Sequence, residues 1–503
     1  MFNAITLIDG YKADHRRQYP EGTEHVYSNW TPRGSRIDGI DHVVNVGLQY
    51  FLMEYLGEQF TYSFFERDVD EVCDEYERRM VTYLGPNAIG SQHIRDLHEL
   101  GYLPLEFKSL PEGALVPLRV PMFTVENTHP DFFWLVNYIE TLMSNVLWMP
   151  MTSATIAKRM RGLLDEYAVK TGSPKEFVDW QGHDFSMRGM AGVESAVLSG
   201  FGHLTQFTGT DTIPAIDFVE TYYPVLKDSN DGFDFVDAEL DDTYLIGGSV
   251  AATEHSVMCA GGEDDERETY ARLIDLYPSG IVSVVSDTWD LWKVVTETLP
   301  SLKDEILARD GKLVVRPDSG DPADILCGIR GRQAGPDGIP ETKGVVELLW
   351  DTFGGTITET GHKLLDSHIG VIYGDSINYE RAKDILERLD AKGFASANVV
   401  FGMGSFGYQY QTRDTFGFAM KATNVTIDGV EKPIFKNPKT DNGLKKSLRG
   451  RISVLKNTDT GEYYAVDDAS EWAQKESELK TVWKDGIFTE IATFSQVRTL
   501  ARG

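Results

Sequence analysis

The chain has little cysteine and no long apolar run. Its 503 residues contain three cysteines, Cys73, Cys259 and Cys327, which are odd in number and follow no ligand spacing. This pattern argues against a disulfide framework and a thiolate metal site, and it suits a reducing compartment. No uninterrupted apolar stretch approaches the ~20 residues that a membrane-spanning helix needs. The segment Met1–Asp9 has neither a basic region nor a long apolar core, so we expect no signal peptide and a cytoplasmic protein.

Positive charge is also scarce. The 48 Lys and Arg residues face 78 Asp and Glu residues, which gives a formal net charge of −30. Such a surface repels nucleic acid and anionic lipid, so we expect neither as a partner. An anionic substrate would need a local concentration of cations. The stretch from Gln411 to Lys456 has one, with ten Lys or Arg against four Asp or Glu.

This basic stretch has two interpretations. One is a solvated basic face. The other is a site that binds an anion, because the stretch follows a glycine-rich loop. Its cations include Arg413, Lys421, Lys436, Lys439, Lys445, Lys446, Arg449 and Arg451.

The first part of the chain predicts a mixture of helices and strands. The apolar content of 41% and charged content of 25% are typical of a globular chain large enough for two or more domains. Periodicity predicts helices over 42–58 and 67–83, strands within 104–126 around a turn at Leu110–Gly113, and two helices within 131–172 that break near Pro150.

From about residue 178 onward, short apolar runs alternate with helical stretches. The runs are 281–285, 313–315, 369–373 and 398–401, and the helices are expected from Asp290, near 341–352 and at 378–392. Alternation at this spacing predicts parallel strands covered by helices, either open or closed as a barrel. Beyond 405 the chain is strand-rich again, with turns expected at Asp428-Gly429 and Asn442-Gly443.

These patterns together predict an α/β fold with two domains. Residues 151–399 are expected to form a central, irregular (β/α) barrel-type domain. Residues 1–150 plus 400–503 are expected to pack together as a second, α+β domain. The pairing of the two terminal segments is a hypothesis about assembly and does not follow from periodicity.

Polar residues follow each predicted strand of the central domain. Arg316 and Asp318 follow 313–315, and the other strand ends carry Ser286-Asp287, Gly374-Asp375 and Gly402–Ser405. In parallel α/β folds the loops after the strand C-termini build the site. An Arg grips phosphate, carboxylates suit ribose hydroxyls or hydrated magnesium, and a glycine loop offers N–H groups to a phosphate. Taken singly, such an Asp can also be a helix N-cap or the partner of a neighbouring Arg.

The last of these loops spells a nominal dinucleotide fingerprint, Gly402-x-Gly404-x-x-Gly407. That fingerprint should open a helix within a βαβ unit. Residues 408–414 have no apolar stripe, so we expect a loop that holds one phosphate instead.

Two further groups are candidates for chemistry. Phe185, Arg188 and Asp211 lie in predicted loops, where they could stack on a flat ring and hydrogen-bond its substituent. The alternative is that Phe185 belongs to the core and Arg188 is its salt-bridged neighbour. His255 stands beside Glu254 and is either a catalytic residue or a structural hydrogen-bonding one. The chain has no His-Glu-x-x-His motif, and we predict no metal bound by direct side-chain ligation.

Read in order, these motifs resemble a known family from end to end. The matching segments are Asp9–His15 with Gln18–Pro20, His183–Phe185 with Arg188-Gly189, Gly209–Thr212, Glu254–Ser256, Val282–Asp287, Arg316–Gly320, Gly374-Asp375, Phe401-Gly402 with Gly404, and Thr412–Asp414. The chain resembles the nicotinamide phosphoribosyltransferases, which are type II phosphoribosyltransferases of NAD salvage.

The resemblance implies a pentosyltransferase that converts nicotinamide and phosphoribosyl pyrophosphate into nicotinamide mononucleotide and pyrophosphate with Mg²⁺. It also implies a homodimer with sites at the subunit interface. ATP would phosphorylate His255, beside Glu254, and so drive the equilibrium toward product.

The resemblance assigns roles around the pyridine ring. Phe185 would stack on one face, and Tyr11 of the partner subunit on the other. Asp211 would accept a hydrogen bond from the carboxamide, with Arg188 and Ser283 near the same ring. We hypothesise that Asp211 selects nicotinamide over nicotinate, because it accepts from an amide and repels a carboxylate.

A second set of residues would hold the phosphoribosyl and pyrophosphate groups. Arg316 would bind the phosphoribosyl moiety or pyrophosphate, and Asp287 belongs to the same surroundings. The remaining residues implied are Asp318, Gly374 and Asp375 at the ribose, Gly404 and Ser405 with the partner's Arg413 and Lys421 at the 5′-phosphate, and the partner's Arg33 and Lys436 at pyrophosphate.

Two departures from the family pattern stand out. Ser186-Met187 replaces the Gly-Tyr of vertebrate members, which changes contacts at the ring edge. Ser405 replaces a second loop glycine, which reshapes the phosphate loop. Two alternatives stay open: a nicotinate phosphoribosyltransferase, against which Asp211 argues, and a non-catalytic nucleotide-binding homologue, against which Arg316, Asp318, Asp375 and Arg413 argue.

Overall fold

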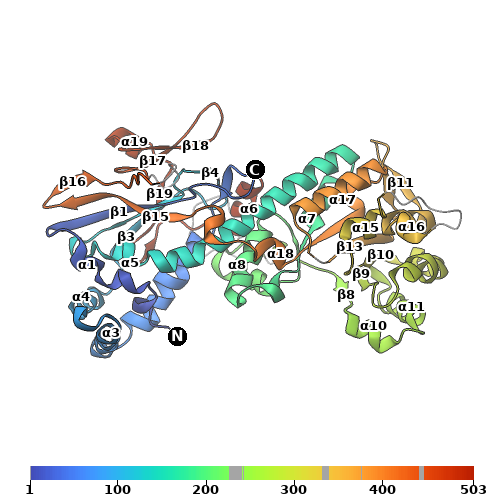
Figure 1. Ribbon diagram of the computed structural model, residues 1–503, viewed down its shortest axis with the longest axis horizontal. Helices are drawn as coiled ribbons and strands as arrows, with labels where there is room; N and C mark the ends of the chain where they lie inside the picture. Colours follow the sequence, from blue (N-terminus) through green and yellow to red (C-terminus); the bar gives the residue numbers. More distant parts are fainter. Residues whose placement is uncertain (1, 226–240, 242, 331–338, 375, 441–446) are drawn as a thin grey trace. The chain divides into compact units, whose positions relative to one another are not determined.

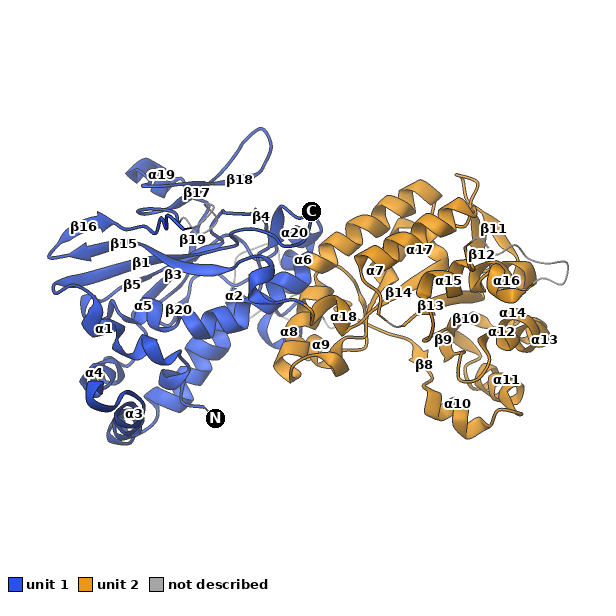
Figure 2. Cartoon of the chain, viewed as in Figure 1, with its two compact units in different colours: residues 1–155, 218–244, 411–503 blue, residues 156–217, 245–410 orange. Residues whose placement is uncertain are grey.

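The computed structural model describes residues 2–503 except 226–240, 242, 331–338, 375 and 441–446 (Figure 1). The chain forms two compact units (Figure 2). Unit 1 consists of Met1–Thr155, Phe218–Tyr244 and Gln411–Gly503, and unit 2 of Ile156–Asp217 and Leu245–Tyr410. The expected domain division stays a prediction. The segment Phe218–Tyr244 belongs to unit 1 together with the terminal segments, whereas the prediction included it in the barrel domain 151–399.

Unit 2 is built on a seven-stranded sheet in the order β7-β6-β14-β13-β10-β9-β8, in which every neighbouring pair is parallel. The strands are β6 (Gly182–Asp184), β7 (Gly209–Thr210), β8 (Ala251–Ala252), β9 (Ser279–Val285), β10 (Asp310–Arg316), β13 (Ile369–Tyr373) and β14 (Val399–Met403). This arrangement confirms the predicted irregular barrel of parallel strands.

One short segment connects the two edges of this curled sheet. Gly248 N donates to Thr208 O, and Thr210 N donates to Gly248 O, both at 2.9 Å. Four residues later Ala252 pairs with Ser283 of β9. The segment Gly248–Ala252 therefore hydrogen-bonds to β7 on one side and to β9 on the other, and it closes the ring of strands.

Helices cover the outside of this sheet, and their apolar faces form the core of unit 2. In α17 (Tyr379–Ala391), the residues Ala382, Ile385, Leu386 and Leu389 recur every three or four positions and are buried. Asn378 caps this helix by accepting from Arg381 N at 3.0 Å. The predicted helix at 378–392 is thereby confirmed. The helix expected near 341–352 is α16 (Val345–Phe353), and the one expected from Asp290 begins with α12 (Leu291–Lys293).

Unit 1 has an antiparallel seven-stranded sheet in the order β16-β15-β1-β5-β3-β19-β20. The strands are β1 (Thr23–Thr31), β3 (Leu105–Ser109), β5 (Phe123–Asn127), β15 (Ala419–Ile427), β16 (Val430–Pro433), β19 (Lys480–Lys484) and β20 (Ile487–Phe488). N- and C-terminal segments thus share one sheet, which confirms the predicted α+β part.

The hairpin of β15 and β16 confirms a turn that the sequence predicts. Asp428 and Gly429 have φ angles of 51° and 69°, the left-handed region that a tight hairpin requires at both positions. The other predicted turn, Asn442-Gly443, lies outside the described residues. The predicted helix 67–83 is confirmed as α3 (Val69–Leu84).

Two helix predictions were wrong in part. His42–Val44 is strand β2, paired with β4 (Leu115–Pro117), and the helix begins only at Leu48 because Gly47, with φ of 98°, turns the chain there. Further along, α6 (Glu140–Thr171) is not broken at Pro150. A proline removes one helical hydrogen bond, but the helix continues because its neighbours Met149 and Met151 are buried in the core.

None of the described helices combines the length and the apolar character needed to cross a bilayer.

Candidate functional site

Strand β10 shows how the inner surface of the barrel is made. Lys312, Val314 and Arg316 line an internal cavity, while the alternate residues Leu313 and Val315 are fully buried against the surrounding helices. This is the two-residue period of a strand that has different surroundings on its two faces. Arg316 ends the strand, so the inner surface passes from an ammonium at one end to a guanidinium at the other.

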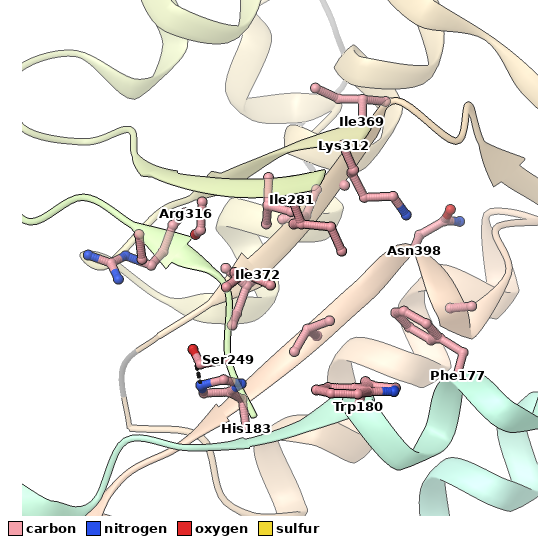
Figure 3. A pocket seen from close by; sticks show the side chains of 18 of the residues that line it. Phe177, Trp180, His183, Ser249, Ile281, Lys312, Arg316, Ile369, Ile372 and Asn398 are labelled. Carbon is pink, nitrogen blue, oxygen red and sulfur yellow. Dashed lines mark hydrogen bonds between the residues drawn. The ribbon is translucent and has the colours of Figure 1, made fainter. Parts of the chain in front are cut away.

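Several positions on the inner surface have a small side chain or none. Besides β10, it includes Ser283 of β9, Gly370 of β13 and Val400 of β14. Most parallel barrels fill this space with large branched residues. Here it is left as a cavity of about 400 Å³, which we call the apolar cavity (Figure 3).

A second cavity, of about 370 Å³, lies at the carboxyl ends of the strands, and we call it the polar cavity. It shares Phe185, Asp211 and Arg316 with the apolar cavity. Its other lining residues that bear on the chemistry are Arg188, Glu254, His255, Asp318, Gly374, Gly404 and Ser405. The two cavities therefore meet at an aromatic ring, a carboxylate and a guanidinium.

Asp184 holds two of the loops in place. Its buried carboxylate accepts from Ser186 N at 2.9 Å and from the Thr212 hydroxyl at 2.7 Å. Its carbonyl accepts from Asp211 N at 2.9 Å. The loop that carries Phe185 and the loop that carries Asp211 are thus fixed to each other through one residue.

Phe185 has its ring close to the backbone of β14. Its N–H donates to Met403 O at 3.0 Å. A Cβ atom at Gly402 would lie 2.7 Å from the Phe185 ring, so only glycine leaves room for the ring there. The His183 ring lies 4.6 Å away, centroid to centroid and tilted.

Asp211 is an ionised hydrogen-bond acceptor. His183 Nε2 lies 2.8 Å from Asp211 Oδ1, and the Ser249 hydroxyl donates to the same oxygen at 2.6 Å. Burial alone would raise the pKa of Asp211, but the hydrogen bonds from His183 and Ser249 outweigh it and hold the pKa below its usual range. The side chain is 45% exposed, so it can also accept from a ligand.

Arg316 and two carboxylates form the opposite side of the polar cavity. The guanidinium donates to Thr253 O at 2.6 Å, and its buried Nε has no partner among the described residues. Asp287 Oδ2 accepts from Asp318 N at 2.9 Å and from Ser319 Oγ at 2.5 Å. Asp287 therefore orients the loop on which the Asp318 carboxylate stands.

His255 lies beside these carboxylates. Its Nε2 is 4.0 Å from Asp287 Oδ1 and 3.9 Å from Asp318 Oδ2. Its Nδ1 is 3.1 Å from the Thr288 hydroxyl. The ring is about half exposed, with a relative accessibility of 48%. A histidine that is open to solvent and next to two carboxylates can accept a phosphoryl group or move a proton.

Most of the remaining predicted residues of unit 2 lie around the same two cavities. Ser283 lines the apolar cavity, and its buried hydroxyl has no partner among the described residues. Arg188, Gly374, Gly404 and Ser405 line the polar cavity. Asp375 lies outside the described residues.

Five predicted residues belong to unit 1. Tyr11 is 60% exposed. Burial lowers the pKa of Lys421, and the charges of Arg33 and Lys436 lower it further, so these three cations are close in space. Arg413 pairs with its neighbour Asp414 at 3.2 Å. Unit 1 thus gathers positive charge in a chain whose net charge is −30.

The sequence did not single out the residues that support Asp211. His183 and Ser249 have no catalytic signature of their own, and Ser249 lies 38 positions from Asp211. In the described part of the chain, no cluster of three or more His, Cys, Asp or Glu side chains is arranged to hold a metal ion.

Comparison with protein families identifies two matches. Residues 180–486 match the nicotinate phosphoribosyltransferase (NAPRTase) family, and residues 3–107 match the nicotinamide phosphoribosyltransferase N-terminal domain. Among curated relatives, the nicotinamide phosphoribosyltransferase of Acinetobacter baylyi is 49% identical over 99% of this chain and 96% of its own length. That of Mycoplasma pneumoniae is 34% identical over 89% and 95%, and that of Xanthomonas campestris pv. campestris is 32% identical over 99% and 98%.

Solved structures support the fold. Nicotinate-nucleotide pyrophosphorylase from Pyrococcus furiosus matches with a TM-score of 0.57 and 14% identity, over 99% of this chain and 94% of the other. Human nicotinic acid phosphoribosyltransferase matches with a TM-score of 0.50 and 16% identity, over 98% and 92%. Taken with the sequence matches, these findings show that the chain belongs to the nicotinamide phosphoribosyltransferases, within the nicotinate phosphoribosyltransferase family.

Proposed function

We propose that the chain transfers phosphoribose from phosphoribosyl pyrophosphate to nicotinamide, giving nicotinamide mononucleotide and pyrophosphate for pyridine nucleotide synthesis. The observation that carries this proposal is the junction of the two cavities, where Phe185 and Asp211 stand next to Arg316. A flat ring at the junction has its substituent near an anionic acceptor and its ring nitrogen directed toward the polar cavity.

Asp211 selects the substrate. An ionised carboxylate accepts a hydrogen bond from a carboxamide N–H, and it repels the carboxylate of nicotinate. The pKa of Asp211 is below its usual range, so this discrimination operates at neutral pH. The Ser283 hydroxyl and Arg316 Nε, which have no partner in the part of the chain that the structure describes, are suited to bind the carboxamide oxygen, while Phe185 stacks on one face of the ring.

The reaction itself depends on positioning and charge. The lone pair of the pyridine nitrogen forms the bond to C1 of the ribose, and the electron pair of the breaking C1–O bond leaves with pyrophosphate. No proton has to be removed from the nucleophile, so no general base is needed. Positive charge develops on the ribose and negative charge on the leaving group, and Asp318 and Arg316 face these charges respectively.

Magnesium fits this site as an ion carried by the substrate. Mg²⁺ is commonly held by one or two carboxylates together with substrate phosphates. Asp287 Oδ1 is buried with no hydrogen-bond partner among the described residues, and with Asp318 it would hold the hydrated ion. The ion would neutralise charge on pyrophosphate as it leaves.

ATP would act through His255. Its exposed ring next to Asp287 and Asp318 supports a phosphoryl transfer in which an N–P bond forms and the bond to ADP breaks. Incubation with γ-labelled ATP should place acid-labile phosphate on the protein. Absence of label from the native chain, or retention of label in His255→Ala, would rule this role out.

We further propose that the active enzyme is a homodimer in which unit 1 of one subunit completes the site of the other. The cations Arg33, Lys421 and Lys436 support this. Burial is the main cause of the lowered Lys421 pKa, and the charges of Arg33 and Lys436 add to it while Glu140 opposes it, so an anionic ligand would stabilise the charged lysine. Tyr11 and Arg413 would be supplied in the same way. An Asp318→Ala chain mixed and re-associated with an Arg33→Ala chain should recover about a quarter of native activity, because half the dimers contain one intact site. Activity that stays at the level of the separate variants would exclude shared sites.

A single assay tests the main proposal. The purified chain is given phosphoribosyl pyrophosphate and Mg²⁺ with nicotinamide, nicotinate or quinolinate, with and without ATP, and each product is quantified. We expect that nicotinamide is converted and that nicotinate and quinolinate are not. Conversion of nicotinate instead of nicotinamide would identify a nicotinate phosphoribosyltransferase. If none of the three substrates is converted, the chain is a non-catalytic binding protein.

A further inference from the structure

A buried histidine of α8 (Val193–Leu204) lies between two parts of the site. His203 is fully buried, and its two ring nitrogens contact elements that are far apart in the sequence. Nε2 lies 2.9 Å from Gly209 O in β7, and Nδ1 lies 2.7 Å from the hydroxyl of Tyr408 in α18 (Ser405–Tyr408). Figure 1 shows α8 and α18 next to each other. The proposed transfer of phosphoribose assigns no role to either side chain.

The chemistry of the partners fixes the direction of both hydrogen bonds. Gly209 O is a carbonyl oxygen, which only accepts, so His203 donates from Nε2. Burial lowers the pKa of His203 and outweighs the opposing charge of Asp184, so the ring is neutral and Nδ1 accepts. Burial also raises the pKa of Tyr408 well above its usual value, so its hydroxyl keeps its proton and donates. The same hydroxyl lies 3.8 Å from Met403 Sδ, which is a weaker acceptor than an imidazole nitrogen.

The first partner, Gly209, leads directly to the residue that selects the pyridine. Strand β7 ends at Thr210, and Asp211 follows it. Because one residue separates Gly209 from Asp211, a shift of the Gly209 carbonyl moves the backbone of Asp211. His203 therefore restrains the strand end that presents this carboxylate to the ring.

The second partner, Tyr408, belongs to the turn that carries the predicted phosphate-binding residues. Gly404 and Ser405 line the polar cavity, and Ser405 begins the helical turn that ends with Tyr408. Gln409 N donates to Ser405 O at 2.7 Å and closes the turn. Tyr408 is fully buried and anchors this turn to the body of unit 2. Its hydrogen bond to His203 therefore restrains where Ser405 lies.

One imidazole thus connects the pyridine side of the site to its phosphate side. The pyridine and the 5′-phosphate are the two ends of the mononucleotide product, so the elements that hold them have to be a fixed distance apart. A histidine that only fills the core needs any two partners for its nitrogens. Here the partners are the two elements whose separation matters, and a rigid ring lies between them.

We propose that His203 is a positioning residue that sets the distance between the pyridine site and the phosphate-binding turn, with Nε2 holding β7 and Nδ1 holding α18. This inference rests on the proposed transfer of phosphoribose and deepens it, because it assigns each ring nitrogen to one of the two substrates. Loss of the Nε2 bond should affect the pyridine, and loss of the Nδ1 bond should affect phosphoribosyl pyrophosphate.

The test measures KM for each substrate at saturating concentrations of the other, on the full chain. His203→Asn keeps an acceptor near the position of Nδ1 and loses the donor to Gly209. It should raise KM for the pyridine between about 3- and 10-fold and leave KM for phosphoribosyl pyrophosphate within about 2-fold of native. His203→Gln keeps the donor and loses the acceptor, so it should show the reverse, and Tyr408→Phe should match it. Tyr464→Phe, at an exposed tyrosine of β18 (Tyr463–Val466), is the control and should leave both KM values unchanged.

A double variant checks that His203 and Tyr408 act through one hydrogen bond. In the chain that carries both His203→Gln and Tyr408→Phe, KM for phosphoribosyl pyrophosphate should equal that of either single variant, because the bond can be lost only once. Effects that multiply would show that the two residues act independently, which overturns the proposal.

The proposal is also overturned if both KM values change together, or if neither changes, in the His203 variants or in Tyr408→Phe. Tyr408→Phe leaves the histidine in place, so it decides the matter even if the His203 variants do not fold. The pyridine used is whichever of nicotinamide and nicotinate the native chain converts. A native chain that converts neither overturns the proposed function and this inference with it, whereas native conversion without the separation of KM effects overturns this inference alone.

Discussion

His183 Nε2 and Asp211 Oδ1 lie 2.8 Å apart. A carboxylate can only accept, so His183 donates a proton from Nε2 in this contact. The other nitrogen lies against the backbone of β7, where a Cβ atom at Gly209 would be 2.7 Å from Nδ1. The histidine is therefore held by the strand on one side and holds the carboxylate on the other.

Removing the charge of Asp211 should abolish the preference for nicotinamide. Asp211→Ala loses both the acceptor for the carboxamide and the repulsion of nicotinate. We expect kcat/KM for nicotinamide to fall between about 10²- and 10⁴-fold, while that for nicotinate is unchanged or rises. The measurement is steady-state kinetics with both substrates. Glu220→Gln, at an exposed carboxylate of α9 (Ile213–Tyr222), is the matched control. An unchanged ratio of the two kcat/KM values would contradict the role of Asp211.

Removing the donor to Asp211 should move the acid limit of activity. The pKa of Asp211 is lowered in the native chain, so its ionised form persists as pH falls and is lost only below the usual range. His183→Leu removes a hydrogen bond that opposes the effect of burial on Asp211, so the pKa of Asp211 rises. The kcat/KM for nicotinamide should then decline at a higher pH than in the native chain. His183→Gln, which keeps an N–H donor, should restore the native profile. The readout is the pH profile between about pH 3 and 8, and coincident acid limbs in all three proteins would show that His183 is only structural.

A methyl group at Gly402 should displace the Phe185 ring. The added Cβ would lie 2.7 Å from that ring and 2.8 Å from Gly374 Cα, so the ring has to move. We expect Gly402→Ala to raise KM for nicotinamide and to lower kcat/KM by up to about 10²-fold. Gly192→Ala is the matched control, because a Cβ there meets nothing within 4 Å and the φ of 175° is extended. A native KM in Gly402→Ala would mean that Phe185 does not position the ring.

Glu112 of unit 1 should make stability depend on pH. Burial raises its pKa from 4.5 to about 7, despite hydrogen bonds from Gln49 N, Gly47 N and the Tyr223 hydroxyl. As pH rises from 4.5 toward 7 the unfolded chain ionises first, so the folded state loses up to about 3 kcal/mol of stability, and the loss is complete above the folded pKa.

Glu112→Gln removes this titration. The Tm of the native chain should therefore fall relative to that of the variant as pH rises through this window, and scanning calorimetry at several pH values measures the difference. The Tm of Glu99→Gln, at an exposed position of α4 (Gln92–Leu100), should change with pH in the same way as that of the native chain. A constant difference between the native chain and Glu112→Gln would show that the carboxyl is ionised throughout.

The sequence predicted the parallel strands because each is a buried β-branched run that ends in polar residues, as Leu313–Val315 ends at Arg316. It could not predict that α6 continues through Pro150, because this depends on the burial of Met149 and Met151, which the local sequence pattern does not show. It also missed β2, since the apolar run at 42–44 is too short for periodicity to separate strand from helix.

For the site, the sequence predicted groups that have a recognisable chemistry, such as Phe185, Asp211 and Asp318. It did not predict their supporting residues. Asp184 and Ser249 are ordinary residue types, and their importance appears only when separate strands are brought side by side. The apolar cavity was out of reach for the same reason: it results from small residues on several strands, of which none is unusual alone.

The segment Gly248–Ala252 closes the ring of strands and also supplies Ser249 to Asp211. Any insertion or deletion in these five residues would open the seam of the barrel and shift the hydroxyl at the same time. We therefore expect that a protein of this fold can change which pyridine it accepts by exchanging side chains in this segment, and that it keeps the length of the segment fixed.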